Sequence, residues 1–271
     1  MLPQAMDFRE ESKALYQLLK PLNDEDLSRV TQFKGWTINH VIGHLHIWNR
    51  AADLSLRDAD EFAAFRERVT ESIMQGRTLR QFEEMWLDGI EGRKLVECWH
   101  DFFIEMSGRF AASDPKARLQ WIGPEMSVRS SITARLMETW AHGQEVYDEL
   151  GVERQDADRI RNIAVLGMNT FAWTFANRGL EVPAEVPCVR LTAPSGEIWV
   201  WNEQNDRDSI EGSATEFCQV AAQTRNIADT KLKVKGDVAT RWMANAQCFA
   251  GPATTPPAPG MRFCRKRAAA G

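Results

Sequence analysis

Residues 36–49 read WTINHVIGHLHIWN, and three of the five histidines of the chain, His40, His44 and His46, fall within them. Thr37 can cap the start of a helix here, because a threonine side chain can accept a hydrogen bond from a main-chain N–H of the first turn. On that helix the apolar residues gather on one side, as they do where a helix faces a core. They are Ile38, Val41, Leu45, Trp48 and Ala52. The stretch therefore predicts a helix of a bundle that also carries possible ligands.

The position of each histidine around this helix predicts how far it faces inward. His44 lies at the edge of the apolar stripe, His40 lies further round, and His46 lies nearly opposite and is expected to face water. A histidine at such an edge is more often a hydrogen-bonded boundary residue than a metal ligand. His40 and His44, four residues apart, could also bind an ion as a pair. The residues of this helix leave these alternatives open.

A second pair with ligand chemistry, Glu138 and His142, occurs in METWAHGQE (137–145). A carboxylate and an imidazole one turn apart can both reach one divalent ion, and with His44 they would form a set of two histidines and one carboxylate. Such a set leaves a coordination position open, as in catalytic metal sites. Periodicity opposes this hypothesis, because both residues belong to a polar stripe, and a charged stripe usually faces solvent. The stripe consists of Ser131, Arg135, Glu138, His142, Glu145 and Glu149.

The chain changes character near Gly179. Before it, helix-compatible stretches with few prolines predict an antiparallel helix bundle. After it, apolar residues alternate on both sides of a Pro194-Ser195-Gly196 turn, which predicts a hairpin, and Ser213 and Glu216 have the spacing of a capping box that opens a helix. The fold class is therefore α+β. We expect a helical bundle over 1–180, a small α+β domain over 187–251, and a Pro-rich, basic, disordered tail over 252–271.

Composition limits the possible functions. The chain is 44% hydrophobic and 26% charged and has no apolar run near the roughly 20 residues of a membrane span, so no membrane partner is expected. A net charge of −5 argues against binding to nucleic acid. Five scattered cysteines without a C-x-x-C pair, and an N-terminus without a signal peptide, predict a cytoplasmic protein with reduced thiols. The motifs of serine hydrolases, nucleotide hydrolases and dinucleotide-binding proteins are not found.

Three features together resemble the DinB-like superfamily: GWTINHVIGHL (35–45), METWAHGQEVYDELG (137–151), and the α+β region that follows. The resemblance is to its mycothiol-dependent maleylpyruvate isomerase branch and, most of all in the C-terminal half, to metal-binding relatives without an assigned reaction. It implies that His44, Glu138 and His142 hold a divalent metal ion, and Zn²⁺ is the ion we expect. For Glu138 and His142 the resemblance reverses the preference for a solvent-facing stripe.

The resemblance also implies an activity. In the family a low-molecular-weight thiol such as mycothiol adds to an activated double bond, the bond rotates, and elimination of the thiol gives the other isomer; relatives transfer the thiol permanently. We therefore expect a small-molecule substrate and a thiol-using isomerase or S-transferase. Arg225 is the position that matches a catalytic arginine of the family, although a cation at a helix C-terminus can also simply satisfy the helix dipole. A non-catalytic metal-binding sensor and a metal-activated hydrolase are the alternatives.

Overall fold

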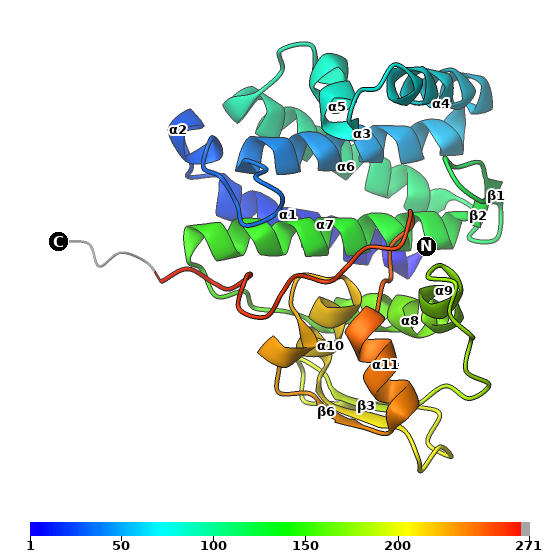
Figure 1. Ribbon diagram of the computed structural model, residues 1–271. Helices are drawn as coiled ribbons and strands as arrows, with labels where there is room; N and C mark the ends of the chain where they lie inside the picture. The colour runs from blue at the N-terminus through cyan, green and yellow to red at the C-terminus, as the bar shows by residue number, and fades with distance from the viewer. Residues whose placement is uncertain (267–271) are drawn as a thin grey trace. The chain divides into compact units, whose positions relative to one another are not determined.

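The computed structural model describes residues 1–266 and confirms the α+β class, with a helical N-terminal region followed by a sheet (Figure 1). The chain divides into two compact units, one covering Met1–Glu149 and one starting at Leu150. The domain limits expected at residues 180, 187 and 251 stay a prediction, and residues 267–271 of the expected tail lie outside the described residues. Among residues 1–266, no helix has the length and apolar character needed to cross a membrane.

The first unit is a bundle of long helices. α3 packs against α4, α5 and α6, and α1 packs against α6, so α3 is surrounded by other helices. The largest fully buried side chains of the unit include Phe8, Trp99 and Trp140, which come from α1, α6 and α7. The elements are α1 (Pro3–Leu19), α2 (Asp24–Leu27), α3 (Ile38–Arg57), α4 (Ala59–Met74), α5 (Leu79–Leu87), α6 (Gly92–Ala112), β1 (Arg118–Leu119), β2 (Met126–Ser127) and α7 (Val128–Leu150).

Two local features fix α3 and the helix beside it. Thr37 caps α3 as predicted: its side chain accepts from the His40 N–H at 3.1 Å, and its own N–H donates to His40 Nδ1 at 3.1 Å. Further along, a Cβ atom built on Gly43 would lie 2.8 Å from Leu87 Cδ1, so the Leu87 side chain would have to shift to admit an alanine. Glycine at this position therefore lets α5 lie directly on α3.

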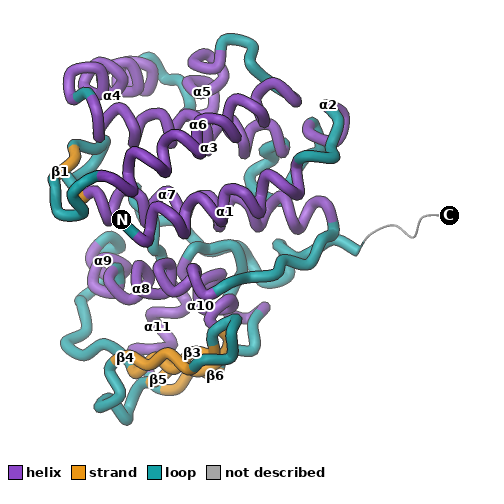
Figure 2. The backbone as a smooth tube through the Cα atoms, turned by 180° about the vertical axis from the view of Figure 1, so that it is seen from behind, coloured by secondary structure: helices purple, strands orange, loops and turns teal. Residues whose placement is uncertain are grey.

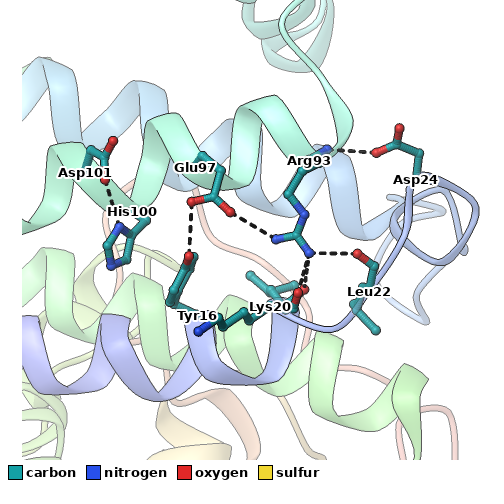
Figure 3. Close-up of polar contacts among 9 residues, drawn as sticks. Tyr16, Lys20, Leu22, Asp24, Arg93, Glu97, His100 and Asp101 are labelled. Atoms are coloured by element: carbon teal, nitrogen blue, oxygen red, sulfur yellow. Dashed lines mark hydrogen bonds and ion pairs between the residues drawn. The ribbon is translucent and has the colours of Figure 1, made fainter.

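The end of α1 is joined to α6 by Arg93 (Figure 3). Its guanidinium donates to the carbonyls of Leu22 at 2.8 Å and Leu19 at 3.3 Å and also to that of Lys20, while its main-chain N–H donates to Asp24 Oδ1 at 2.8 Å. Carbonyls at the end of a helix lack partners within the helix. Arg93 supplies such partners and, through Asp24, fixes the start of α6 beside α2.

The second unit contains a four-stranded sheet in the order β4-β3-β5-β6, with β3 and β5 parallel and the other pairs antiparallel. Figure 2 shows its helices gathered on one face of this sheet. The predicted hairpin is confirmed, with Leu191 paired to Trp199. The elements are η1 (Asp158–Ile160), α8 (Arg161–Asn169), α9 (Phe171–Ala176), β3 (Cys188–Thr192), β4 (Ile198–Trp201), β5 (Ser209–Ser213), α10 (Ala214–Ala221), η2 (Ile227–Asp229), β6 (Lys233–Lys235) and α11 (Asp237–Asn245).

One predicted detail of this unit is wrong. Ser213 does precede α10, but its side chain makes no capping hydrogen bond. The carboxylate of Glu216, expected to complete a capping box, accepts instead from the Lys231 N–H at 3.1 Å. The helix start is therefore right and the capping box is not. After α11 the chain makes further contacts, such as those of the Thr254 N–H with Gln247 Oε1 at 3.0 Å and of the Gly260 N–H with Asp229 Oδ1 at 2.9 Å.

Candidate metal centre

The three residues proposed as ligands come together within the first unit. His44 projects from α3, and Glu138 and His142 project from successive turns of α7. Each offers one ligand atom, and these atoms all lie within 4.8 Å of one another. Glu138 Oε2 is the common neighbour, 3.5 Å from His44 Nε2 and 3.3 Å from His142 Nε2. The side chains of His44, Glu138 and His142 are 11%, 24% and 13% exposed, so the cluster is largely shielded from water.

The polar stripe of α7 is buried, so its interpretation as a solvent-facing stripe is wrong. Ser131, Arg135, Glu145 and Glu149 all belong to the buried residues of the helix. The reason is visible at the centre of the stripe, where Glu138 and His142 face a polar side chain of α3 rather than water. Periodicity identified the stripe correctly, but it does not tell whether a polar face meets solvent or another polar face.

Sequence reasoning missed Glu83 on α5, which holds His44. The side chain of Glu83 is buried, and its Oε1 lies 2.7 Å from His44 Nδ1 and 2.8 Å from Trp48 Nε1, which donates to it. A carboxylate bound to one ring nitrogen directs the other nitrogen of a histidine toward a metal ion. The sequence offers only a weak indication of this role of Glu83. Glu83 lies one turn before Leu87 and therefore on the same face of α5, the face that packs on α3.

The charges of the cluster are strongly coupled. Burial lowers the pKa of His44, but hydrogen bonds to Glu138 and Glu83 outweigh it and raise this pKa to about 9. Burial raises the pKa of Glu138, but its bonds to His142 and His44 and the charge of Arg135 hold it well below its usual range. Burial and the charge of His44 lower the pKa of His142. Without metal, a protonated His44 therefore lies between the carboxyl groups of Glu83 and Glu138.

Aromatic rings form a wall beside the ligands. The Trp36 ring stacks on that of His142, with 5.7 Å between centroids and an angle of 7°, and Phe33 meets the same imidazole edge-on at 5.2 Å. Both rings belong to a short turn closed by Thr31, whose N–H and hydroxyl each donate to the Trp36 carbonyl at 2.8 Å. Within this turn Gly35 has a φ of +70°, which glycine adopts without steric cost. The wall restricts the orientation of His142 and shields it from water.

A cavity of about 290 Å³ reaches His44 and Glu83 from the side of α5. Charged side chains of α5 line it, among them Arg80 and Glu84. His40 also lines this cavity, and its Nε2 lies 3.4 Å from Glu84 Oε1 while its Nδ1 belongs to the cap of α3. His40 therefore helps to cap α3. The ligand atoms that lie close together are those of His44, Glu138 and His142, not those of a His40–His44 pair.

The prediction that His46 faces water is wrong. Its side chain is 8% exposed and contacts the rings of Trp86 and Phe102, at 6.1 and 5.7 Å between centroids. Burial, with a smaller contribution from the charge of Arg50, lowers its pKa to about 4. The error has a simple cause: α3 is surrounded by helices, so even the face opposite its apolar stripe is covered.

Arg225, the predicted catalytic residue, belongs to the second unit and follows α10. Its Nη1 donates to the Thr224 carbonyl at 2.8 Å. A guanidinium bound to a main-chain carbonyl just beyond a helix fits the interpretation as a helix-terminal cation. A catalytic function of Arg225 stays a prediction.

Two histidines and one carboxylate thus converge within the helical bundle, and comparison with known proteins gives the family of the chain. The sequence profile of the mycothiol maleylpyruvate isomerase N-terminal domain matches residues 8–147. Two uncharacterized proteins of Mycobacterium tuberculosis, MT0041 from strain CDC 1551 / Oshkosh and Rv0036c from strain H37Rv, are each 36% identical over 250 residues, or 92% of this chain and 96% of theirs. The chain therefore belongs to the mycothiol maleylpyruvate isomerase N-terminal domain family.

Solved structures agree on the fold. The crystal structure of the mycothiol-dependent maleylpyruvate isomerase, and that of its variant with one histidine replaced by alanine, each match this chain with a TM-score of 0.52. In each case the sequence identity is 14%, and the match covers 82% of this chain and 88% of the isomerase. At this identity the similarity establishes a shared fold, and the reaction of this chain has to be argued from its own residues.

Proposed function

We propose that this protein is a metal-dependent enzyme that uses a low-molecular-weight thiol on an electrophilic small molecule, by cis–trans isomerisation or by transfer of the thiol. The observation that supports it is the convergence of His44, Glu138 and His142, whose ligand atoms lie within 4.8 Å of one another. The family of the chain and the name of its structural relative support a thiol as co-substrate. Mycothiol is the first to test, in a cytoplasmic setting where thiols stay reduced.

The residues of the cluster fit a zinc ion. Zn²⁺ prefers histidine nitrogen and carboxylate oxygen, and catalytic sites use three protein ligands. His44 Nε2 can serve as a ligand because its other nitrogen is held by Glu83 at 2.7 Å, and Glu138 brings a carboxylate with a depressed pKa. When bound, the ion would supply Lewis acidity and lower the pKa of a thiol ligand.

The chain's own residues would prepare this chemistry. Glu83, anchored by Trp48 at 2.8 Å, keeps the ring of His44 oriented toward the other two ligands. Trp36 and Phe33 hold His142 from one side and keep water from that face, which strengthens electrostatic interactions within the site. His44 must lose its extra proton before it can act as a ligand, because its pKa in the metal-free protein is about 9.

Metal analysis tests the ligand set. We expect the wild type to hold about one zinc ion per chain and His44→Ala, Glu138→Ala and His142→Ala to lose it, since each removes one of three ligands. His100→Ala is the matched control, because this histidine lies on α6 and pairs with Asp101, as Figure 3 shows. Equal metal content in all five proteins would overturn the assignment.

An activity screen then separates the possible reactions. Electrophilic substrates carrying a conjugated double bond are assayed with mycothiol, glutathione, coenzyme A and no thiol. Turnover that requires a thiol supports the proposal, and recovery of the free thiol distinguishes isomerisation from transfer. Turnover without thiol identifies a metal-activated hydrolase, and ligand binding without any turnover identifies a sensor. Either of these two results would refute the proposed function.

A further inference from the structure

Arg135 is a buried cation that lies beside Glu138, the middle one of the three candidate ligands. It is on α7, three residues before Glu138 and seven before His142, so all three project from one face of the helix. Arg135 is 4% exposed, and its Nη2 lies 3.8 Å from Glu138 Oε2, the same oxygen that neighbours both imidazoles. Its Nε is buried and has no hydrogen-bond partner among the described residues.

Other arginines of the same unit are held differently. Asp53 accepts hydrogen bonds from the Nε atoms of Arg57 and Arg109, both at 2.7 Å. Arg29 likewise donates to the Glu149 carboxylate at 3.1 Å and to its carbonyl at 2.8 Å. The 3.8 Å contact of Arg135 is too long for a hydrogen bond. A buried guanidinium without full pairing is costly, and proteins keep such groups where a ligand completes the pairing.

The nearest carboxylate cannot complete it. Glu138 already has both histidines as neighbours at 3.3 and 3.5 Å. If Glu138 is a metal ligand, its charge is shared with the ion, and Arg135 needs another anion. Guanidinium groups match carboxylates well, because their parallel N–H groups can bind both oxygens.

We propose that Arg135 binds a carboxylate of the small molecule that enters the metal centre, so that the preferred ligand is a carboxylate-bearing compound. This inference rests on the proposed function, because it takes the three-residue cluster as a metal site. A ligand that places its donor atom at the cluster and its carboxylate a few bonds away would span from the metal ligands to the guanidinium along α7. Arg135 thereby selects for the charge of the ligand, independently of which reaction follows.

Two small thiols, one with a carboxylate and one without, provide the test. The protein is loaded with Co²⁺, whose absorption bands change when a thiol binds, and titrated with 3-mercaptopropionate, which carries a carboxylate, and with 2-mercaptoethanol, which does not. We expect the wild type to bind 3-mercaptopropionate at least about tenfold more tightly, the size typical of a buried charge-assisted hydrogen bond. Arg135→Gln should lose this preference and keep its affinity for 2-mercaptoethanol, and Arg135→Lys should keep part of the preference.

The control and the alternative outcomes keep the inference separate from the proposed function. Arg129→Gln removes an exposed positive charge from the same helix and should leave the preference unchanged. An equal preference in wild type and Arg135→Gln would overturn the inference while leaving the metal site in place. Loss of cobalt from both Arg135 variants would also overturn it, by showing that Arg135 serves Glu138 rather than the ligand. A wild type that binds neither cobalt nor thiol would refute the proposed function itself.

Discussion

Zinc and a proton should compete for His44, and the structure determines the size of this competition. In the metal-free protein the pKa of His44 is raised to about 9 by hydrogen bonds to Glu138 and Glu83, against the opposing effect of burial. At pH 7 this imidazole is therefore protonated, and it must release the proton before Nε2 can bind an ion. The pKa of His142 is lowered and that of Glu138 lies well below its usual range, so neither carries a proton to release at pH 7.

The free-energy cost of deprotonating His44 at pH 7 follows from the difference of about two units between this pH and its pKa. Between pH 7 and a pKa of about 9, deprotonation of His44 costs about 2.7 kcal/mol at roughly 1.36 kcal/mol per unit. The apparent zinc affinity at pH 7 should thus be about a hundredfold weaker than above pH 9, and it should rise about tenfold per unit in between. At pH 6, where ionisation of zinc-bound water does not contribute, binding should release at least about one proton per ion, the one held by His44.

Calorimetric zinc titration measures the proton directly. Repeating the titration at pH 6 in buffers with different ionisation enthalpies gives the number of protons released, and a competing chelator gives the affinity at each pH. Glu83→Gln removes one of the two carboxylates that raise the pKa of His44, so the rise of affinity with pH should level off at a lower pH in this variant. A zinc affinity that stays constant between pH 6.5 and 8.5, with no proton released at pH 6, would refute the reasoning.

Three further predictions address residues around the site. Glu83→Gln should weaken zinc binding about 10- to 100-fold by releasing the His44 ring, whereas Glu84→Gln, at a half-exposed neighbouring position, should not; chelator competition above pH 9, where a proton no longer competes for His44, decides. His46 has a pKa of about 4, below the unfolded value of 6.5, so the protein should lose up to about 3 kcal/mol of stability as the pH falls from 6.5 to 4, and His46→Leu should lose less in urea denaturation across this range. Arg93→Ala should lower the stability by about 1–3 kcal/mol by leaving carbonyls at the end of α1 unpaired, whereas Lys94→Ala at the next, exposed position should stay within about 0.5 kcal/mol in the same assay.

Features that depend on nearby residues were predictable from the sequence. Thr37 caps α3, and the turn at Pro194-Ser195-Gly196 joins two paired strands, because a cap or a hairpin is decided within a few residues. Where the partner is distant in sequence, the prediction failed. The carboxylate of Glu216 was expected to bond within its own helix, but it meets the main chain of Lys231. Glu83 lies 39 residues from the histidine that it holds, and no local pattern marks that pair.

The helical stripes of α3 and α7 explain why the ligand set could not be derived from periodicity. A hydrophobic stripe predicts which side of a helix faces a core only if the opposite side faces water. α3 fails this condition because α4, α5 and α6 all pack on it, which buries His46. α7 fails it because its polar face turns toward His44. A polar face buried against a second polar face gains stability only if its charges are paired, so burial of such a stripe is itself a sign of a site. On this face of α7 Glu138 pairs with two histidines and Glu149 with Arg29, whereas the Nε of Arg135 has no hydrogen-bond partner among the described residues, and a ligand that enters the site can supply one.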